Sequence, residues 1–270
     1  MNDFSGKIIL GRTGLHVSRM GIGSSYGVGE KGCRTAFEAG INYFFWGSVR
    51  TVGMGLALRH LAKYHRKDVV ITLESYARKP EHLERSIEIG LKKLKIDYAD
   101  ILLLGWHDGI PDNSITDTVL NLKEKGLFHF LGISSHQRPL FQGFLKDGFY
   151  DVFHLRYNAA HRGAEKDIFP FLNKKTDPGI VSFTNTRWGD LLKAKNMPKG
   201  IQPMSASDCY RFSLSNPNVH VAISGPKNDK ELESALCVLG SDPVSGNEME
   251  KFRKIGDHVH GVTTLMSYLS

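Results

Sequence analysis

Eight short apolar segments, separated by stretches with helical spacing, constrain the fold of this chain more than any other feature. Each segment is rich in β-branched and aromatic residues and has the length of a buried strand. They are residues 19–24, 41–47, 69–75, 99–106, 128–135, 151–158, 179–185 and 219–225. Apolar strands that alternate with helices are typical of a parallel sheet covered on both faces.

The number of strands decides between two arrangements of such a sheet. No linker rich in proline and glycine divides the 270 residues. One closed (β/α)8 TIM barrel is therefore favoured over two smaller doubly wound domains. We predict a single barrel domain over residues 1–270.

A short segment ahead of the first strand has the pattern of a hairpin. In KIILGRTGLHVSR, residues 7–19, the turn formers Arg12, Thr13 and Gly14 lie between two short extended runs. This pattern predicts an N-terminal β-hairpin, which we expect to cap the bottom of the barrel.

Ligands of such barrels bind at the carboxyl ends of the strands. The residues that close the eight apolar segments are therefore the first candidates for a site, and most of them are polar. They are Gly47 to Arg50, Glu74, Gly105 to His107, Ser134 to His136, Arg156 to Asn158, Thr184 to Arg187 and Gly225 to Asn228. We expect a small-molecule ligand at this mouth.

Composition excludes several other classes of protein. The net charge is +7, but the basic clusters fall at expected helix ends and in connections, which indicates solvated caps rather than a nucleic-acid surface. No apolar run approaches the ~20 residues of a membrane span. The first residues lack a secretion signal, so we expect a cytoplasmic protein. Three widely spaced cysteines, Cys33, Cys209 and Cys237, predict reduced thiols.

Local motifs give weaker signals. GIGSSYGVG, residues 21–29, is interpreted as a glycine-rich first loop from which Tyr26 reaches a ligand, because its glycines do not match a dinucleotide fingerprint. Ser134 and Ser135 end a strand and suit either a ligand or a helix cap. Lys227 and Asn228 precede an expected helix whose N-terminus favours phosphate. The HVH at 258–260 lacks nearby carboxylates, so we predict no metal site.

Several segments, taken in order, resemble the aldo/keto reductase family. They are LGRTGLHVSRMGIG, GINYF, KLKIDYADILLL, KEKGLFHFLGISSH, YNAAHR and NPNVHVAISGP, and the similarity as a whole spans roughly residues 7–239. The resemblance implies a (β/α)8 barrel that binds NADP(H) without a Rossmann domain. It also implies carbonyl reduction by an Asp-Tyr-Lys-His tetrad, in which the tyrosine donates the proton.

The resemblance places other residues at the four tetrad positions. Phe45 stands where the aspartate is expected, Arg50 at the tyrosine, Glu74 at the lysine and Gly105 at the histidine. An alignment shifted by two residues would offer His107 as the histidine instead. Ordinary carbonyl reduction by the tetrad is therefore not expected from this chain.

The replacements suggest a different set of candidate catalytic groups. Phe45 cannot ionise, and an arginine, with a pKa above about 12, is a poor general acid. We expect Arg50 and Glu74 to form an ion pair at the mouth. Arg50, Glu74, His107 and Tyr26 are the candidate acid, base and anion-binding groups, and His107 is the expected proton shuttle because of its intrinsic pKa.

The resemblance also implies a set of cofactor-binding positions. Ser134 and Ser135 match the pair that holds the nicotinamide amide, His154 replaces a glutamine beside it, and Thr184 stands where an aromatic ring usually stacks. The remaining positions lie along the expected path of the phosphates and adenosine. They are Arg187, Gly225, Lys227, Asn228, Glu233 and Ser234.

Three functions fit these observations. The first is an NADP(H)-dependent oxidoreductase of unknown substrate with rewired residues. The second is an inactive nucleotide-binding sensor or partner-binding barrel. The third is an enzyme reassigned to another anionic ligand held by Arg50, Arg156 and Arg187. The sequence predicts neither the substrate, nor the oligomeric state, nor whether the chain is catalytically active.

Overall fold

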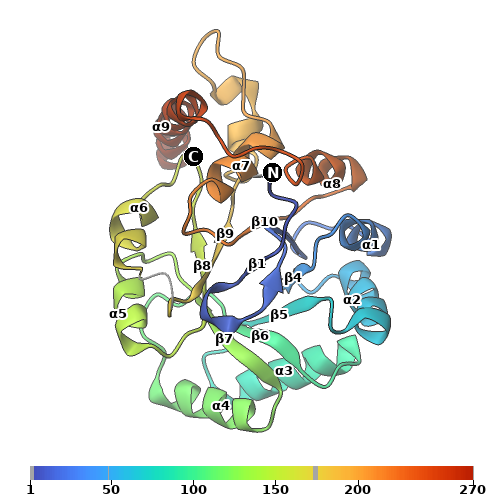
Figure 1. The fold of residues 1–270 in the computed structure, drawn as a ribbon. Helices are drawn as coiled ribbons and strands as arrows, with labels where there is room; N and C mark the ends of the chain where they lie inside the picture. Colours follow the sequence, from blue (N-terminus) through green and yellow to red (C-terminus); the bar gives the residue numbers. More distant parts are fainter. Residues whose placement is uncertain (1–2, 48, 173–175, 270) are drawn as a thin grey trace.

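Eight parallel strands form a closed barrel (Figure 1). The computed structural model describes residues 3–47, 49–172 and 176–269. Neighbours around the barrel follow the order β10-β3-β4-β5-β6-β7-β8-β9. The strands are β3 (Met20–Gly23), β4 (Tyr43–Trp46), β5 (Val70–Ser75), β6 (Ala99–Leu104), β7 (Phe128–Ser134), β8 (Val152–Arg156), β9 (Gly179–Phe183) and β10 (Val221–Ser224). Each coincides with one of the eight apolar segments, so the predicted barrel is confirmed.

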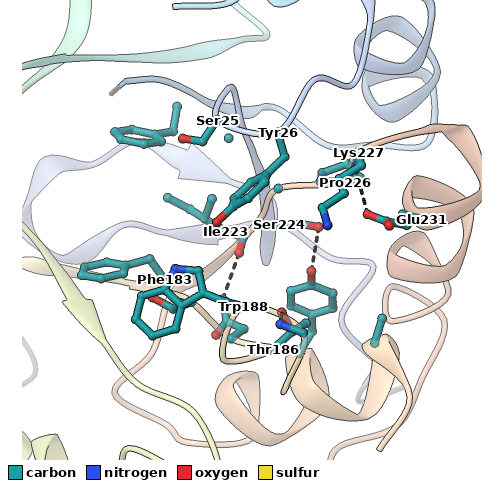
Figure 2. A pocket seen from close by; sticks show the side chains of 18 of the residues that line it. Ser25, Tyr26, Phe183, Thr186, Trp188, Ile223, Ser224, Pro226, Lys227 and Glu231 are labelled. Atoms are coloured by element: carbon teal, nitrogen blue, oxygen red, sulfur yellow. Dashed lines mark hydrogen bonds between the residues drawn. The ribbon is translucent and has the colours of Figure 1, made fainter. Parts of the chain in front are cut away.

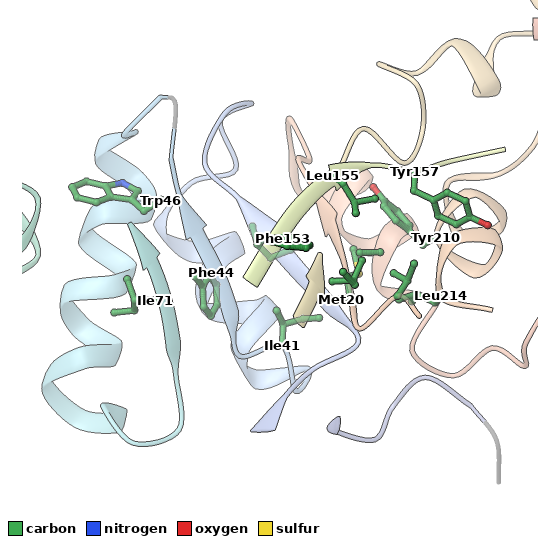
Figure 3. Packing of buried hydrophobic residues seen from close by; sticks show 14 of the residues in the cluster. Met20, Ile41, Phe44, Trp46, Ile71, Phe153, Leu155, Tyr157, Tyr210 and Leu214 are labelled. Atoms are coloured by element: carbon green, nitrogen blue, oxygen red, sulfur yellow. The ribbon is translucent and has the colours of Figure 1, made fainter. Parts of the chain in front are cut away.

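Helices surround the barrel and cover its outer face (Figure 1). In α3 the residues Leu83, Ile87, Leu91 and Leu94 are all buried, as their spacing predicts. The helices are α1 (Glu30–Glu38), α2 (Val52–His65), α3 (Pro80–Leu94), α4 (Asn113–Glu124), α5 (Leu140–Asp147), α6 (Ala164–Asp167), α7 (Ala206–Leu214), α8 (Asp229–Leu236) and α9 (Gly246–Leu269). One large core lies between the helices and the outward side chains of the strands, as Figure 3 shows for Phe44, Ile71 and Phe153.

The predicted hairpin is present and seals one end of the barrel. Strands β1 (Ile8–Ile9) and β2 (His16–Val17) pair antiparallel around a short 3-10 turn, η1 (Gly11–Thr13). Leu10 and Val17 are fully buried. They pack in a second apolar cluster with Tyr43, Val70, Ile101, Val152, Val181 and Val221, whose strands line the barrel interior.

Polar contacts and one close backbone approach hold the hairpin in this position. Arg12 reaches Asp151, with 3.1 Å between Nε and Oδ1, and also donates to the carbonyl oxygens of Gly148 and Tyr150. A Cβ at Gly179, the first residue of β9, would lie 2.5 Å from the Leu10 side chain. Only glycine therefore lets the hairpin pack this closely against β9.

The long C-terminal helix packs beside the loop that follows β9, an arrangement for which the sequence offered no signal. The loop contains two 3-10 turns, η3 (Asp190–Leu192) and η4 (Ala194–Asn196). The helix also contacts the loop after β8, where Arg162 pairs with Asp257 of α9 at 2.6 Å.

The HVH segment, residues 258–260, lies within α9. Within the described residues, no group of three or more His, Cys, Asp or Glu side chains is arranged to hold a metal ion.

Two further sequence expectations can be compared with the described part of the chain. Cys33 and Cys209 are buried and Cys237 is exposed, and all three are free thiols. None of the helices in residues 3–47, 49–172 and 176–269 is both long and apolar enough to cross a bilayer.

The seal at the bottom of the barrel can be tested by shortening its central side chain. Leu10→Ala should lower the free energy of unfolding by about 2–5 kcal/mol, because it removes a fully buried side chain from a closed cluster. Ile9→Ala is the matched control on the same hairpin, since Ile9 is 53% exposed. Urea unfolding of both variants measures the difference, and equal small losses would contradict the seal.

Candidate functional site

A cavity of about 650 Å³ opens at the carboxyl ends of the barrel strands. Every strand of the barrel contributes a side chain or main-chain surface to it. These contributions are Gly23, Phe45, Glu74, Leu103, Ser134, His154, Phe183 and Ile223. The expected ligand site at the barrel mouth thus exists as a hollow, and its lower end is closed by the hairpin.

Aromatic rings form the walls of this cavity. Tyr26, Trp106, Phe183 and Trp188 line it, and Figure 2 shows Tyr26 reaching across it from the first loop, above Phe183 and Trp188. The Tyr26 ring packs directly on the main chain of Gly225, where a Cβ would overlap it. Tyr26, predicted as a site residue, therefore does line the cavity, as does Gly225.

A histidine and two aromatic side chains build the floor. His154, in the middle of β8, is buried, and its Nε2 lies 2.8 Å from the Tyr43 hydroxyl. The Phe45 ring lies 5.4 Å from the His154 ring, centre to centre. Burial lowers the pKa of His154 to about 3, so the imidazole is neutral at ordinary pH.

Glu74 and Gly105 fit together at the adjoining strands β5 and β6. Glu74 is buried, lines the cavity and pairs with Leu103 across the two strands. A Cβ at Gly105 would lie 2.7 Å from Oε1 of Glu74. The carboxylate thus occupies the space that any side chain at position 105 would need, so these two residues are complementary in volume.

Arg50 does not point into the cavity, which corrects one expectation. Its guanidinium donates to the main-chain oxygen of Glu74 at 2.7 Å, to the Ser86 carbonyl at 2.9 Å and to the Ser86 hydroxyl at 3.1 Å. It also lies 5.5 Å from the Trp46 ring centre. These bonds tie the turn after β4 to α3. Burial lowers the pKa of Arg50, and the charge of Glu74 opposes this effect, so the two charges still interact.

His107 also lies apart from the residues that line the cavity. Its main-chain N–H donates to the Ser134 carbonyl at 2.8 Å, and its side chain is buried. Burial, and then the charge of Arg78, lower its pKa to about 4. The histidine expected to move protons is therefore packed behind the wall, and its role as a shuttle finds no support in this geometry.

Ser134, the last residue of β7, and Ser135, which follows it, have different surroundings. Ser134 lines the cavity, and its Oγ accepts the Trp106 N–H at 2.8 Å, so its own hydroxyl proton remains available to a ligand. The Ser135 Oγ accepts the Gln137 N–H at 2.9 Å, which makes it a turn cap. Successive residues of a strand face opposite sides, which explains why only one of the pair faces the cavity.

The N-termini of two helices converge on the far part of the cavity. The Ser205 hydroxyl accepts a hydrogen bond from the Asp208 N–H and so caps α7, and Ser205 also lines the cavity. Asn228 caps α8 by accepting the Glu231 N–H at 2.9 Å. Lys227 and Glu231 line this part of the cavity (Figure 2).

Of the predicted cofactor positions at α8, some line the cavity and others do not. Lys227 and Ser234 line it, whereas Asn228 and Glu233 are not among the lining residues. Asn228 acts instead as the helix cap. Glu231, which the sequence did not single out, accepts the Lys227 main-chain N–H at 2.9 Å and so places a carboxylate at the start of α8.

Arg187 and Thr184 lie in the loop after β9. Thr184 lines the cavity, whereas Arg187 is buried against α9, where its Nε donates to the Thr263 hydroxyl at 2.9 Å. Both have left-handed backbone angles, as do Trp106 and Trp188. Non-glycine residues in this conformation are strained, and such strain is concentrated at functional sites. The strained residues around the cavity therefore give separate support for a functional site there.

Several lining residues lie outside the predicted catalytic and cofactor-binding sets. Trp188, Tyr210 and Ser224 line the cavity, and the Tyr210 hydroxyl is 2.7 Å from the Ser224 hydroxyl. His136 lines it near Trp106 and bonds Arg156. Their place at strand ends predicted His136 and Arg156 at the mouth, but nothing in the sequence showed that the two side chains contact each other.

Comparison with known proteins gives one consistent result. A model of the aldo/keto reductase family matches residues 30–208. The chain is 30% identical to an L-galactose dehydrogenase of Arabidopsis thaliana over 301 aligned residues, which cover 89% of this chain and 92% of the relative. It is 29% identical to the methylglyoxal reductase DkgA of Yersinia pestis over 92 residues, a third of each chain.

Solved structures agree on the fold. The holo form of aldo-keto reductase AKR11C1 from Bacillus halodurans superposes with a TM-score of 0.78. The match covers 93% of this chain and 96% of that one, at 19% sequence identity. At this identity the likeness establishes the shared barrel architecture.

The buried histidine on the cavity floor predicts acid sensitivity. His154 resists protonation in the folded chain until about pH 3, whereas the ordinary value is 6.5, so acid favours the unfolded chain, which takes up the proton. Stability should therefore fall as pH drops below 6.5. His154→Gln should reduce this slope by about 1.4 kcal/mol per pH unit. Urea unfolding between pH 7 and 5 measures it.

The matched control is the exposed His258 on α9. His258→Gln should leave the slope of stability against pH as it is in the parent chain. A His154→Gln slope equal to that of the parent would show that the floor histidine does not govern acid sensitivity.

Proposed function

Because the chain belongs to the aldo/keto reductase family, we propose that it is an oxidoreductase that binds NADP(H) in the barrel cavity and acts on a small carbonyl compound or the corresponding alcohol. One observation carries the proposal. Six of the ten residues predicted to bind the cofactor line one continuous cavity, namely Ser134, His154, Thr184, Gly225, Lys227 and Ser234. When bound, the nicotinamide would supply or accept a hydride.

The groups in the cavity fit the parts of such a cofactor. Ser134 and His154 offer hydrogen-bonding groups for a carboxamide at the floor, about where the strands end. The starts of α7 and α8, with Ser205 and Lys227, face the far part, and helix N-termini favour phosphate groups. The aromatic walls in between would exclude water from a flat ring.

Glu231 modifies this fit at the start of α8. Its carboxylate accepts the Lys227 N–H, a donor that a phosphate would otherwise use. A phosphate near this amide must therefore compete with a negative charge. NADPH carries an additional phosphate on its adenosine, so we expect Glu231 to weaken its binding more than that of NADH.

The groups at the reacting end differ from the usual tetrad. Phe45 has no ionisable group, Arg50 is turned toward α3, and Glu74 fills the space beside Gly105. These observations favour a second candidate function, in which the nucleotide binds without ordinary carbonyl turnover and its occupancy serves as a signal. The third interpretation, an anion held by three arginines, loses Arg50 because its hydrogen bonds go to α3 and β5.

The names of the relatives suggest substrates for a first screen. One is an L-galactose dehydrogenase and another a methylglyoxal reductase. We propose small aldehydes and aldoses as the substrate class, because the aromatic walls accept a short chain or ring and Glu74 offers an acceptor for hydroxyl groups.

Titration with NADPH tests the proposed cofactor. We expect saturable binding and a raised melting temperature, since a ligand at a hundred times its dissociation constant stabilises a fold by about 2.7 kcal/mol. Turnover of methylglyoxal, aromatic aldehydes or L-galactose would establish the oxidoreductase. Binding without turnover of the panel would favour the sensor, and no binding of NADPH or NADH would refute the cofactor site.

The role of Glu231 has a separate test. Glu231→Gln should tighten NADPH binding about fivefold, because it removes roughly 1 kcal/mol of repulsion between two charges near the surface. NADH, which lacks the extra phosphate, is the control ligand and should change less. Cofactor fluorescence gives the dissociation constants of both ligands. An equal change for NADPH and NADH would contradict the proposed repulsion between Glu231 and the additional phosphate.

A further inference from the structure

His136 lies where a hydrogen-bonding group could act on a ligand in the cavity. It follows β7 and lines the cavity wall. Its ring is flanked by Trp106 at 4.8 Å and by Phe183 at 5.7 Å, measured between ring centres. The imidazole is therefore held between two aromatic rings rather than turned freely into solvent.

Arg156 at the end of β8 determines which ring nitrogen of His136 carries the proton. Nη2 of Arg156 lies 2.6 Å from Nδ1 of His136. A guanidinium has only N–H donors and stays protonated, so Nδ1 must accept. In the neutral imidazole the proton is then on Nε2, which leaves an N–H donor on the other side of the ring.

The charges around His136 favour this neutral form. Burial, and then the charge of Arg156, lower the pKa of His136, and Asp108 opposes them. Asp108 itself accepts the Trp106 indole N–H at 2.9 Å. Arg156 lies 5.0 Å from the Trp188 ring centre, so its cation is fixed on both sides. These are the charged and aromatic groups that face the imidazole.

Glu74 and His154, two other polar groups on the wall, are less suited to donate to a ligand oxygen. An ionised Glu74 only accepts hydrogen bonds. Nε2 of His154 is already engaged with the Tyr43 hydroxyl. A neutral imidazole held by a neighbouring group can stabilise charge on a carbonyl oxygen without giving up its proton.

We propose that His136 donates a hydrogen bond from Nε2–H to the carbonyl oxygen of the small molecule in the cavity, and that Arg156 is the positioning residue that holds His136 in this tautomer. The inference rests on the proposed function, since it assumes a carbonyl ligand at this mouth. It assigns to His136 the stabilisation of the oxygen that the usual tetrad tyrosine would provide.

Histidine nitrogen NMR tests the positioning without any turnover. In the parent chain His136 should be the Nε2–H tautomer at neutral pH. Arg156→Gln should give a mixture of tautomers and raise the pH at which His136 titrates, because a positive charge is removed. Arg156→Lys, which keeps a cationic donor, should retain more of the original behaviour. A parent His136 protonated on Nδ1 would overturn the proposal.

Kinetics with 4-nitrobenzaldehyde and NADPH test the ligand contact. His136→Ala should lower kcat/KM about a hundredfold, as loss of a donor to a developing oxyanion does. His136→Gln, which keeps an N–H donor, should recover part of the loss, and the NADPH dissociation constant should stay unchanged. An unchanged kcat/KM in His136→Ala would overturn the proposal.

The two hypotheses can fail separately. If the parent chain binds NADPH but neither reduces an aldehyde nor oxidises an alcohol of the panel, the oxidoreductase is refuted. The inference is then decided by the His136 Nε2–H resonance on addition of 4-nitrobenzaldehyde. A saturable shift that Arg156→Gln weakens supports the contact, and no shift overturns it.

Discussion

The apolar seal at the bottom of the barrel is the constraint on which the rest of the structure depends. Leu10 and Val17 close the interior from below with a layer of valine, isoleucine and tyrosine side chains. A closed parallel barrel with one end filled leaves only the carboxyl ends of its strands open. The side chains that line the cavity therefore gather at this one open end of the barrel.

At that mouth, steric fit explains several residues that look unrelated in the sequence. Glu74 and Gly105 occupy complementary volumes. The Phe45 ring likewise overlies Gly47, where a Cβ would overlap it. Arg50 leaves the mouth and binds α3. The residues at the four tetrad positions therefore pack closely against their neighbours, as a site with a changed set of catalytic groups would require.

Much of the architecture could be predicted because the signals were local and repeated. Apolar strands alternating with amphipathic helices identify the barrel, and Arg12 to Gly14 identify the hairpin turn. The positions of side chains at strand ends were harder to predict. Ser134 and Ser135 differ only in which way they face, and the left-handed backbone of Trp106 precedes a His107 that is turned out of the cavity wall.

The contacts that sequence reasoning missed join distant segments of the chain. His136 and Arg156 belong to different strands, and only the barrel brings their nitrogens within 2.6 Å. Arg187 was expected near a pyrophosphate, but its guanidinium donates a hydrogen bond to Thr263 of α9, which lies 76 residues further along the chain. No local pattern encodes either meeting.

A crystal structure with NADPH tests the central claim most directly, because the claim is that the nicotinamide lies at the cavity floor among this chain's substituted residues. The account predicts the carboxamide within hydrogen-bonding distance of Ser134 or His154, and His136 facing the space above the ring. A nucleotide bound elsewhere, or a cavity that excludes it at saturating concentration, would contradict the account.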